Sequence, residues 1–127
     1  MSDHFEPRKD CPAIRAANAA YIAALLETLL PAMRLAARGA GYAVAVHGSL
    51  ARDIDLVAIP WTSTAMTAEH LVDRLLGAIA GVLGRATLHG KWTDKPHGRK
   101  AITIISTAEM EIDLSIMPRD TPAEGAE

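Results

Sequence analysis

The sequence contains few of the residues that mark several classes of protein. Its 127 residues include one cysteine, Cys11, which excludes an internal disulfide framework. Only five residues are aromatic, so the core has to be built from leucine, isoleucine and valine, with alanine allowing close packing. Thirteen basic and fifteen acidic residues give a net charge of −2, which excludes a generally basic nucleic-acid-binding surface. The length predicts one domain with one ordinary core.

The sequence predicts neither a secretion signal nor a membrane span. The first ten residues are charged, and no apolar run follows them directly. The longest apolar stretch, residues 16–37, is interrupted by polar residues and a proline, whereas a span needs about 20 predominantly apolar residues. We therefore expect a cytoplasmic protein without membrane contact. Its single domain is predicted over residues 12–117, with a flexible N-terminus at 1–11 and a flexible acidic tail at 118–127.

Apolar spacing predicts two main helices and four to five strands. Residues 13–38 follow a helical pattern in which Pro31 is expected to kink or split the helix. A second helix is predicted over 68–83, with Thr67 as its N-cap. The predicted strands cover residues 42–47, 54–59, 86–92, 100–106 and 110–117. The last two are expected to form a hairpin, so the fold class is α/β (α+β), with a mixed sheet packed against the two helices.

Three glycines in the second predicted helix share one face. Gly77, Gly81 and Gly84 are three or four positions apart. Glycine costs up to about 1 kcal/mol in a helix. Their spacing therefore predicts a close approach of this helix to the sheet as compensation.

Three aspartates are the candidate catalytic and metal-binding residues. Asp53 and Asp55 are two positions apart in a strand pattern, so they share a face, and their repulsion is unfavourable unless a cation lies between them. Carboxylate oxygens suit Mg²⁺ or Mn²⁺. Asp113 lies in the middle of an apolar strand, where aspartate is disfavoured, and a position beside the first pair would explain it. The alternative is that each aspartate is an ordinary solvated residue.

Two further segments are candidate phosphate-binding sites. Gly48 and Ser49 leave the first predicted strand in a turn whose N–H groups and hydroxyl suit phosphate oxygens, and Arg52 adds a fixed positive charge. Residues 89–100 contain four Lys or Arg and one Asp, a local net charge of +3. The residues of this segment that we predict to bind nucleotide are Lys95, His97 and Arg99. The alternatives for the segment are a solvated hairpin edge and a nucleic-acid contact.

This pattern resembles the motif of the nucleotidyltransferase superfamily, which includes DNA polymerase beta, the CCA-adding enzymes and the minimal nucleotidyltransferases. Gly48-Ser49 precedes the Asp53-x-Asp55 pair, and Asp113 follows in a later apolar strand. The resemblance covers residues 40–117. It implies that the Gly-Ser turn holds a triphosphate, that the aspartate pair binds two metal ions, and that Asp113 completes the metal site and helps to deprotonate an attacking hydroxyl. Three residues separate Ser49 from Asp53, fewer than is usual in the family.

The resemblance implies transfer of a nucleoside monophosphate from a nucleoside triphosphate to a hydroxyl acceptor, with Mg²⁺ or Mn²⁺ as cofactor. The acceptor stays open between a small molecule, a protein and an RNA end. A homodimer and a protein partner also stay open. The shortened Gly-Ser connection favours an alternative, a weak or inactive binding or regulatory protein of the same fold, such as an antitoxin-like partner.

Overall fold

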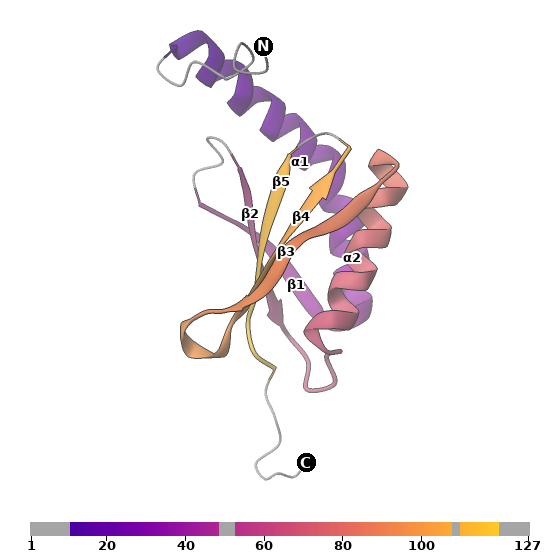
Figure 1. Cartoon of the computed structure of the whole chain (residues 1–127). Coiled ribbons are helices and arrows are strands. Elements are labelled where there is room, and N and C mark those ends of the chain that lie inside the picture. The colour runs from indigo at the N-terminus through magenta and orange to yellow at the C-terminus, as the bar shows by residue number, and fades with distance from the viewer. Residues whose placement is uncertain (1–10, 49–52, 108–109, 120–127) are drawn as a thin grey trace.

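The computed structural model describes residues 11–48, 53–107 and 110–119, and Figure 1 shows its layers. One five-stranded sheet carries two helices on one of its faces, and no helix or strand of the described residues covers the other, which we call the open face. The elements in chain order are α1 (Pro12–Ala40), β1 (Tyr42–His47), β2 (Ile54–Pro60), α2 (Ala68–Leu83), β3 (Ala86–Asp94), the short 3-10 turn η2 (Pro96–Gly98), β4 (Lys100–Ser106) and β5 (Glu111–Ile116). This arrangement confirms the predicted α+β class.

The sheet is mixed, with the strand order β1-β2-β5-β4-β3. β2 and β5 are parallel, and the other three neighbouring pairs are antiparallel. The predicted hairpin is the antiparallel β4–β5 pair. Since β5 lies between β4 and β2, the last strand of the chain is brought beside the second.

Helix α1 is one continuous element that runs through Pro31, so the predicted split does not occur. Pro31 is exposed on the outer side, whereas Leu29 and Met33 on either side of it are buried. The helix ends at Gly41, whose φ of 93° requires glycine and whose N–H donates to the Arg38 carbonyl.

Helix α1 also has the length and apolar composition of a membrane-spanning helix. Its first turns project past the sheet in Figure 1 and are exposed. From Ile22 to Ala40, however, its apolar residues at helical spacing are buried in the core. Packing against the sheet and α2 therefore accounts for that part of the composition.

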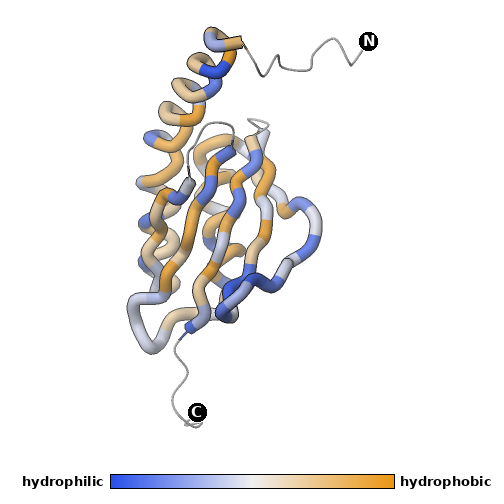
Figure 2. Tube along the Cα trace, turned by 90° about the vertical axis from the view of Figure 1, so that its left-hand side faces the viewer, coloured by the Kyte–Doolittle hydropathy of each residue, from blue (hydrophilic) through white to orange (hydrophobic). Residues whose placement is uncertain are grey.

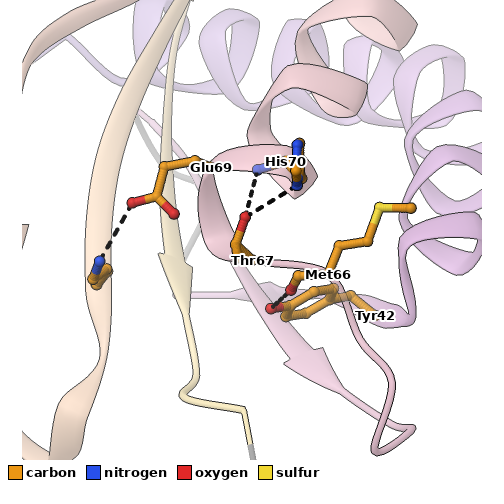
Figure 3. A network of polar contacts seen from close by, with 6 residues as sticks. Tyr42, Met66, Thr67, Glu69 and His70 are labelled. Atoms are coloured by element: carbon orange, nitrogen blue, oxygen red, sulfur yellow. Dashed lines mark hydrogen bonds and ion pairs between the residues drawn. The ribbon is translucent and has the colours of Figure 1, made fainter.

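The core lies between the helices and the covered face of the sheet. On the two parallel strands every second residue points into it, as Ile54, Leu56, Ile112 and Leu114 do. Figure 3 shows how β1 is joined to the segment just before α2: the Tyr42 hydroxyl donates to the Met66 carbonyl at 2.7 Å.

Helix α2 begins at the predicted N-cap. The Thr67 hydroxyl accepts the N–H of His70 at 3.2 Å, and Glu69 in the first turn pairs with Lys100 of β4 at 3.4 Å (Figure 3). A carboxylate at this position also suits the helix dipole.

The glycines of α2 do not approach the sheet, and that prediction is wrong. A Cβ added at Gly77, Gly81 or Gly84 would meet no atom of another element within 4 Å. Gly84 has a function at the helix end, where its φ of 95° forms the left-handed C-cap. Gly77 and Gly81 lie on the exposed side, because spacing alone shows that residues share a face and not which way the face points.

The basic segment is mostly strand. β3 continues to Asp94, so Lys91 belongs to an edge strand of the sheet. Only residues 95–99 form a turn, which is closed by a hydrogen bond from the Lys95 N–H to the Arg99 carbonyl at 2.8 Å. Figure 2 shows this turn as one of the most hydrophilic parts of the trace.

Candidate active site

The sheet register aligns one polar residue from each strand across the open face. Starting from β1, this polar row consists of His47, Asp55, Asp113, Thr103 and His89. In Figure 2 hydrophilic positions interrupt the hydrophobic colour of the strands. A polar row on the uncovered side of an otherwise apolar sheet is the most distinctive feature of the described chain.

Asp55 and Asp113 are direct neighbours in this row. They are register partners on the parallel strands β2 and β5, whose backbones lie about 4.8 Å apart in any such pair. Both carboxylates point to the open face, since the residues on either side of each aspartate are fully buried on the helix side. The structure thus brings together two of the three predicted aspartates, from positions 58 residues apart in the sequence.

The two carboxylates interact unfavourably. Partial burial raises the pKa of the Asp55 carboxyl, and the neighbouring carboxylates of Asp113 and Asp53 raise this pKa further. The His47 imidazole, the register partner of Asp55 on β1, acts in the opposite direction and lowers this pKa. The site therefore concentrates negative charge where the protein itself supplies only partial compensation.

Thr103 orients the second carboxylate. Its hydroxyl donates a hydrogen bond to Oδ1 of Asp113 at 2.8 Å, from the adjacent antiparallel strand β4. A hydrogen bond of this length to a charged acceptor is among the stronger ones in proteins. Asp113 is consequently held between Asp55 on one side and Thr103 on the other.

Gly48 packs directly against Asp55. A Cβ at this position would lie 2.8 Å from Oδ2 of Asp55, and the φ of 81° is one that side chains rarely adopt. The structure therefore places Gly48, a predicted phosphate-binding residue, beside a predicted metal-binding carboxylate. Its predicted neighbours Ser49 and Arg52 lie outside the described residues.

A cavity of about 390 Å³ lies over the polar row. Its lining includes Asp55 and Asp113 at the base and Lys91 and Lys95 from β3 and the following turn. Cations and carboxylates thus face the same space, an arrangement suited to a polyanionic ligand bound together with a divalent cation.

Three predicted residues lie away from this cavity. Asp53 is exposed just before β2 and does not line the cavity, although its charge reaches Asp55. His97 is exposed in the turn η2, with a φ of 67°. Arg99 contributes to the same turn, because its Nε donates to the Pro96 carbonyl at 3.2 Å. Of the three predicted basic-segment residues, only Lys95 lines the cavity.

The residues present fit a magnesium-type ion that is shared with a substrate. Within the described chain no group of three or more His, Cys, Asp or Glu side chains is arranged to hold a metal ion on its own. Mg²⁺, however, is commonly bound by one or two carboxylates, with waters and substrate phosphates completing its shell. The Asp55–Asp113 pair offers such carboxylates, and a cation there would relieve the repulsion that raises the pKa of Asp55.

Sequence reasoning missed Thr93 and Thr103, which line the cavity beside the aspartates. One signal for Thr103 was available: it alternates with Ile102 and Ile104, so it points away from the core side of its strand. The register that sets it opposite Asp113 is fixed by the β4–β5 pairing, and the local pattern carries no information about that register.

The comparisons with known proteins include a solved structure of low similarity. No protein-family model and no curated protein matches the sequence. Among solved structures, the chain is similar to a cytoplasmic RNA terminal U-transferase, with 17% sequence identity and a TM-score of 0.49 over 77% of this chain. The chain spans 28% of the length of that transferase chain. The interpretation of the site accordingly depends on its own geometry.

Proposed function

We propose that this domain is a metal-dependent nucleotidyltransferase that moves a nucleoside monophosphate from a nucleoside triphosphate to a hydroxyl acceptor. One observation carries the proposal: Asp55 and Asp113 lie side by side on parallel strands, in a cavity that also contains Lys91 and Lys95. In this open space the two carboxylates can bind a divalent cation, and the two ammonium groups can bind the negatively charged triphosphate.

Each residue has a role that follows from its position. Lys91 and Lys95 neutralise the phosphate oxygens, and the absence of a side chain at Gly48 leaves room for the Asp55 carboxylate. Divalent ions held by Asp55 and Asp113 would stabilise the charge on the entering and leaving oxygens. Thr103 fixes the Asp113 carboxylate in one orientation.

The chemical step is an in-line displacement at the α-phosphorus. The acceptor hydroxyl oxygen forms a bond to this phosphorus, and the bond between it and the α–β bridging oxygen breaks, so that pyrophosphate leaves. Asp113 accepts the hydroxyl proton. Proton removal by a positioned side chain contributes about 10²–10⁴-fold to such reactions. The acceptor class, a small molecule, a protein or an RNA end, is the open part of this proposal.

Nucleotide binding can be tested without knowing the acceptor. Calorimetric titration with a non-hydrolysable triphosphate in the presence of Mn²⁺ is expected to give a binding isotherm that is lost in Asp55→Asn and in Asp113→Asn. Glu111→Gln is the matched control, because Glu111 lies on β5 two positions before Asp113 and outside the cavity lining. Absence of binding to every nucleoside triphosphate would favour the alternative, a regulatory protein with this fold.

Transfer itself is tested with α-labelled triphosphates and a panel of acceptors: an RNA oligonucleotide, a protein mixture and a small-molecule polyol. We expect label in one acceptor class, with a loss of at least about 100-fold in either aspartate variant. Transfer that survives in the Asp55→Asn, Asp113→Asn double variant would reject the assignment of the site.

A further inference from the structure

Outside the cavity, a second groove follows the outer edge of β1. It has a volume of about 270 Å³ and is lined by Arg34 and Arg38 of α1, by Trp61, and by residues 42–44. β1 is the last strand of the sheet on this side, and no described strand pairs with its outer edge. The proposed transferase activity gives no function to this groove.

The outer edge of β1 presents backbone groups that are available for pairing. Trp61 donates its N–H to the Gly41 carbonyl, so odd-numbered residues from 41 onward direct their backbone groups toward β2. Val44 and Val46 therefore direct theirs outward. Arg34 confirms this direction, because its Nε reaches the Val44 carbonyl from the outside at 3.5 Å.

Two arginines lie beside this edge, and neither has an acidic partner in the described part of the chain. Among the described residues neither Arg34 nor Arg38 forms an ion pair, and no carboxylate lines the groove. Arg38 instead lies over the Trp61 ring, 5.1 Å from its centroid, and Trp61 is 54% exposed. The groove is thus positively charged, and its charge complement is an anion.

The spacing of the arginines matches a β-strand. Arg34 and Arg38 are one helical turn apart, about 6 Å along the axis. Alternate residues of a strand are separated by about 6.6 Å and point to the same side. An added strand with acidic side chains at alternate positions would therefore place one carboxylate near each guanidinium.

We propose that the outer edge of β1 binds an extended acidic peptide of a partner protein, which adds to the sheet as a further strand and pairs alternate carboxylates with Arg34 and Arg38. The peptide N–H replaces the Arg34 Nε at the Val44 carbonyl, and this frees the guanidinium for a carboxylate. A second copy of the chain does not fit this edge, since antiparallel pairing of two β1 edges would bring arginines of both copies together.

The binding test uses a fluorescein-labelled peptide with glutamate at alternate positions, Thr-Val-Glu-Val-Glu-Val-Thr, followed by anisotropy. We expect saturable binding that weakens about 5-fold in Arg34→Ala and in Arg38→Ala, as for an exposed ion pair of about 1 kcal/mol. Arg85→Ala is the matched control, because Arg85 is an exposed arginine between α2 and β3, at the opposite edge of the sheet. The same peptide with glutamine in place of glutamate is expected to bind more weakly.

A second measurement separates strand addition from simple anion binding. Backbone N-methylation of the peptide at the positions that face β1 is expected to abolish binding, whereas N-methylation at the alternate positions is tolerated. This measurement leaves the protein unchanged, so folding of a variant is not in question. Absence of binding, equal affinity for the glutamine peptide, indifference to both arginine variants or indifference to N-methylation would each overturn the proposal.

Discussion

The two faces of the sheet use the same strands for opposite purposes. On the helix side, Ile112 and Leu114 of β5 are completely enclosed and stabilise the fold. On the open side, Asp113 lies between them in sequence and beside the like charge of Asp55 in space. Alternation along a single strand therefore separates stability from the candidate chemistry, residue by residue. The comparison indicates that the charged groups on the open face lower the stability of the fold slightly, whereas the apolar groups on the helix side provide it.

The largest effect is expected on the covered face. Leu114→Ala removes a side chain that is 1% exposed, and large-to-small changes at such positions cost about 2–5 kcal/mol of unfolding free energy. Ser115→Ala, at the next position on the open side, is the matched control and is expected to change stability by less than about 0.5 kcal/mol. Urea denaturation measures both. Similar losses in the two variants would contradict the division between the faces.

A smaller effect of opposite sign is expected on the open face. Because the folded-state pKa of Asp55 is raised, the folded protein binds more protons than the unfolded chain as the pH rises from near 3.8 through the folded-state value. Stability is therefore lost over this interval. Asp55→Asn avoids the loss, and because Asp55 is only partly buried and its charge is screened by solvent, we expect a gain of up to about 1 kcal/mol.

Urea denaturation of the metal-free protein, in EDTA, tests this expectation. The gain in Asp55→Asn should be present at neutral pH and vanish as the pH falls toward 3.8. Glu111→Gln is the control, since Glu111 is exposed at the start of β5 and is not one of the charges that act on the pKa of Asp55. If Asp55→Asn is instead less stable than the unchanged protein at neutral pH, the Asp55 carboxylate makes favourable contacts. That result would contradict the expectation that the charges of the open face lower stability.

The sequence predicted which residues of a strand share a face, but it did not predict which strands are neighbours in the sheet. The apolar residues at every second position around Asp113 predicted that its side chain points away from those of Ile112 and Leu114, and the spacing of Asp53 and Asp55 predicted only that these two share a face. Their adjacency requires β5 to insert between β2 and β4, which is a tertiary event that no local pattern encodes. Thr103 was missed for the same reason, because its contact with Asp113 depends on the hairpin register.

The helices show a related limit. The apolar positions of α1 predicted its buried side, and the same side lets the helix continue through Pro31, since the proline faces outward. The glycines of α2 were misjudged because equal spacing describes an inward and an outward face equally well. Propensity arguments thus predict elements reliably here, but the direction in which a face points is decided by packing.

The smallest expected effect extends the comparison to the outer side of α2. Gly77 lies in the helix interior with open space around it, so Gly77→Ala is expected to stabilise the protein by about 0.5–1 kcal/mol, through helix propensity and a less flexible unfolded chain. Gly84→Ala meets equally open space but a φ of 95°, and it is expected to destabilise by about 1 kcal/mol. Thermal unfolding of the two variants separates the effect of backbone conformation from that of side-chain packing. Because neither added methyl group touches another element, stability changes of opposite sign in the two variants can arise only from the backbone conformation. A loss of stability in Gly77→Ala would mean that the outer side of α2 is covered in solution.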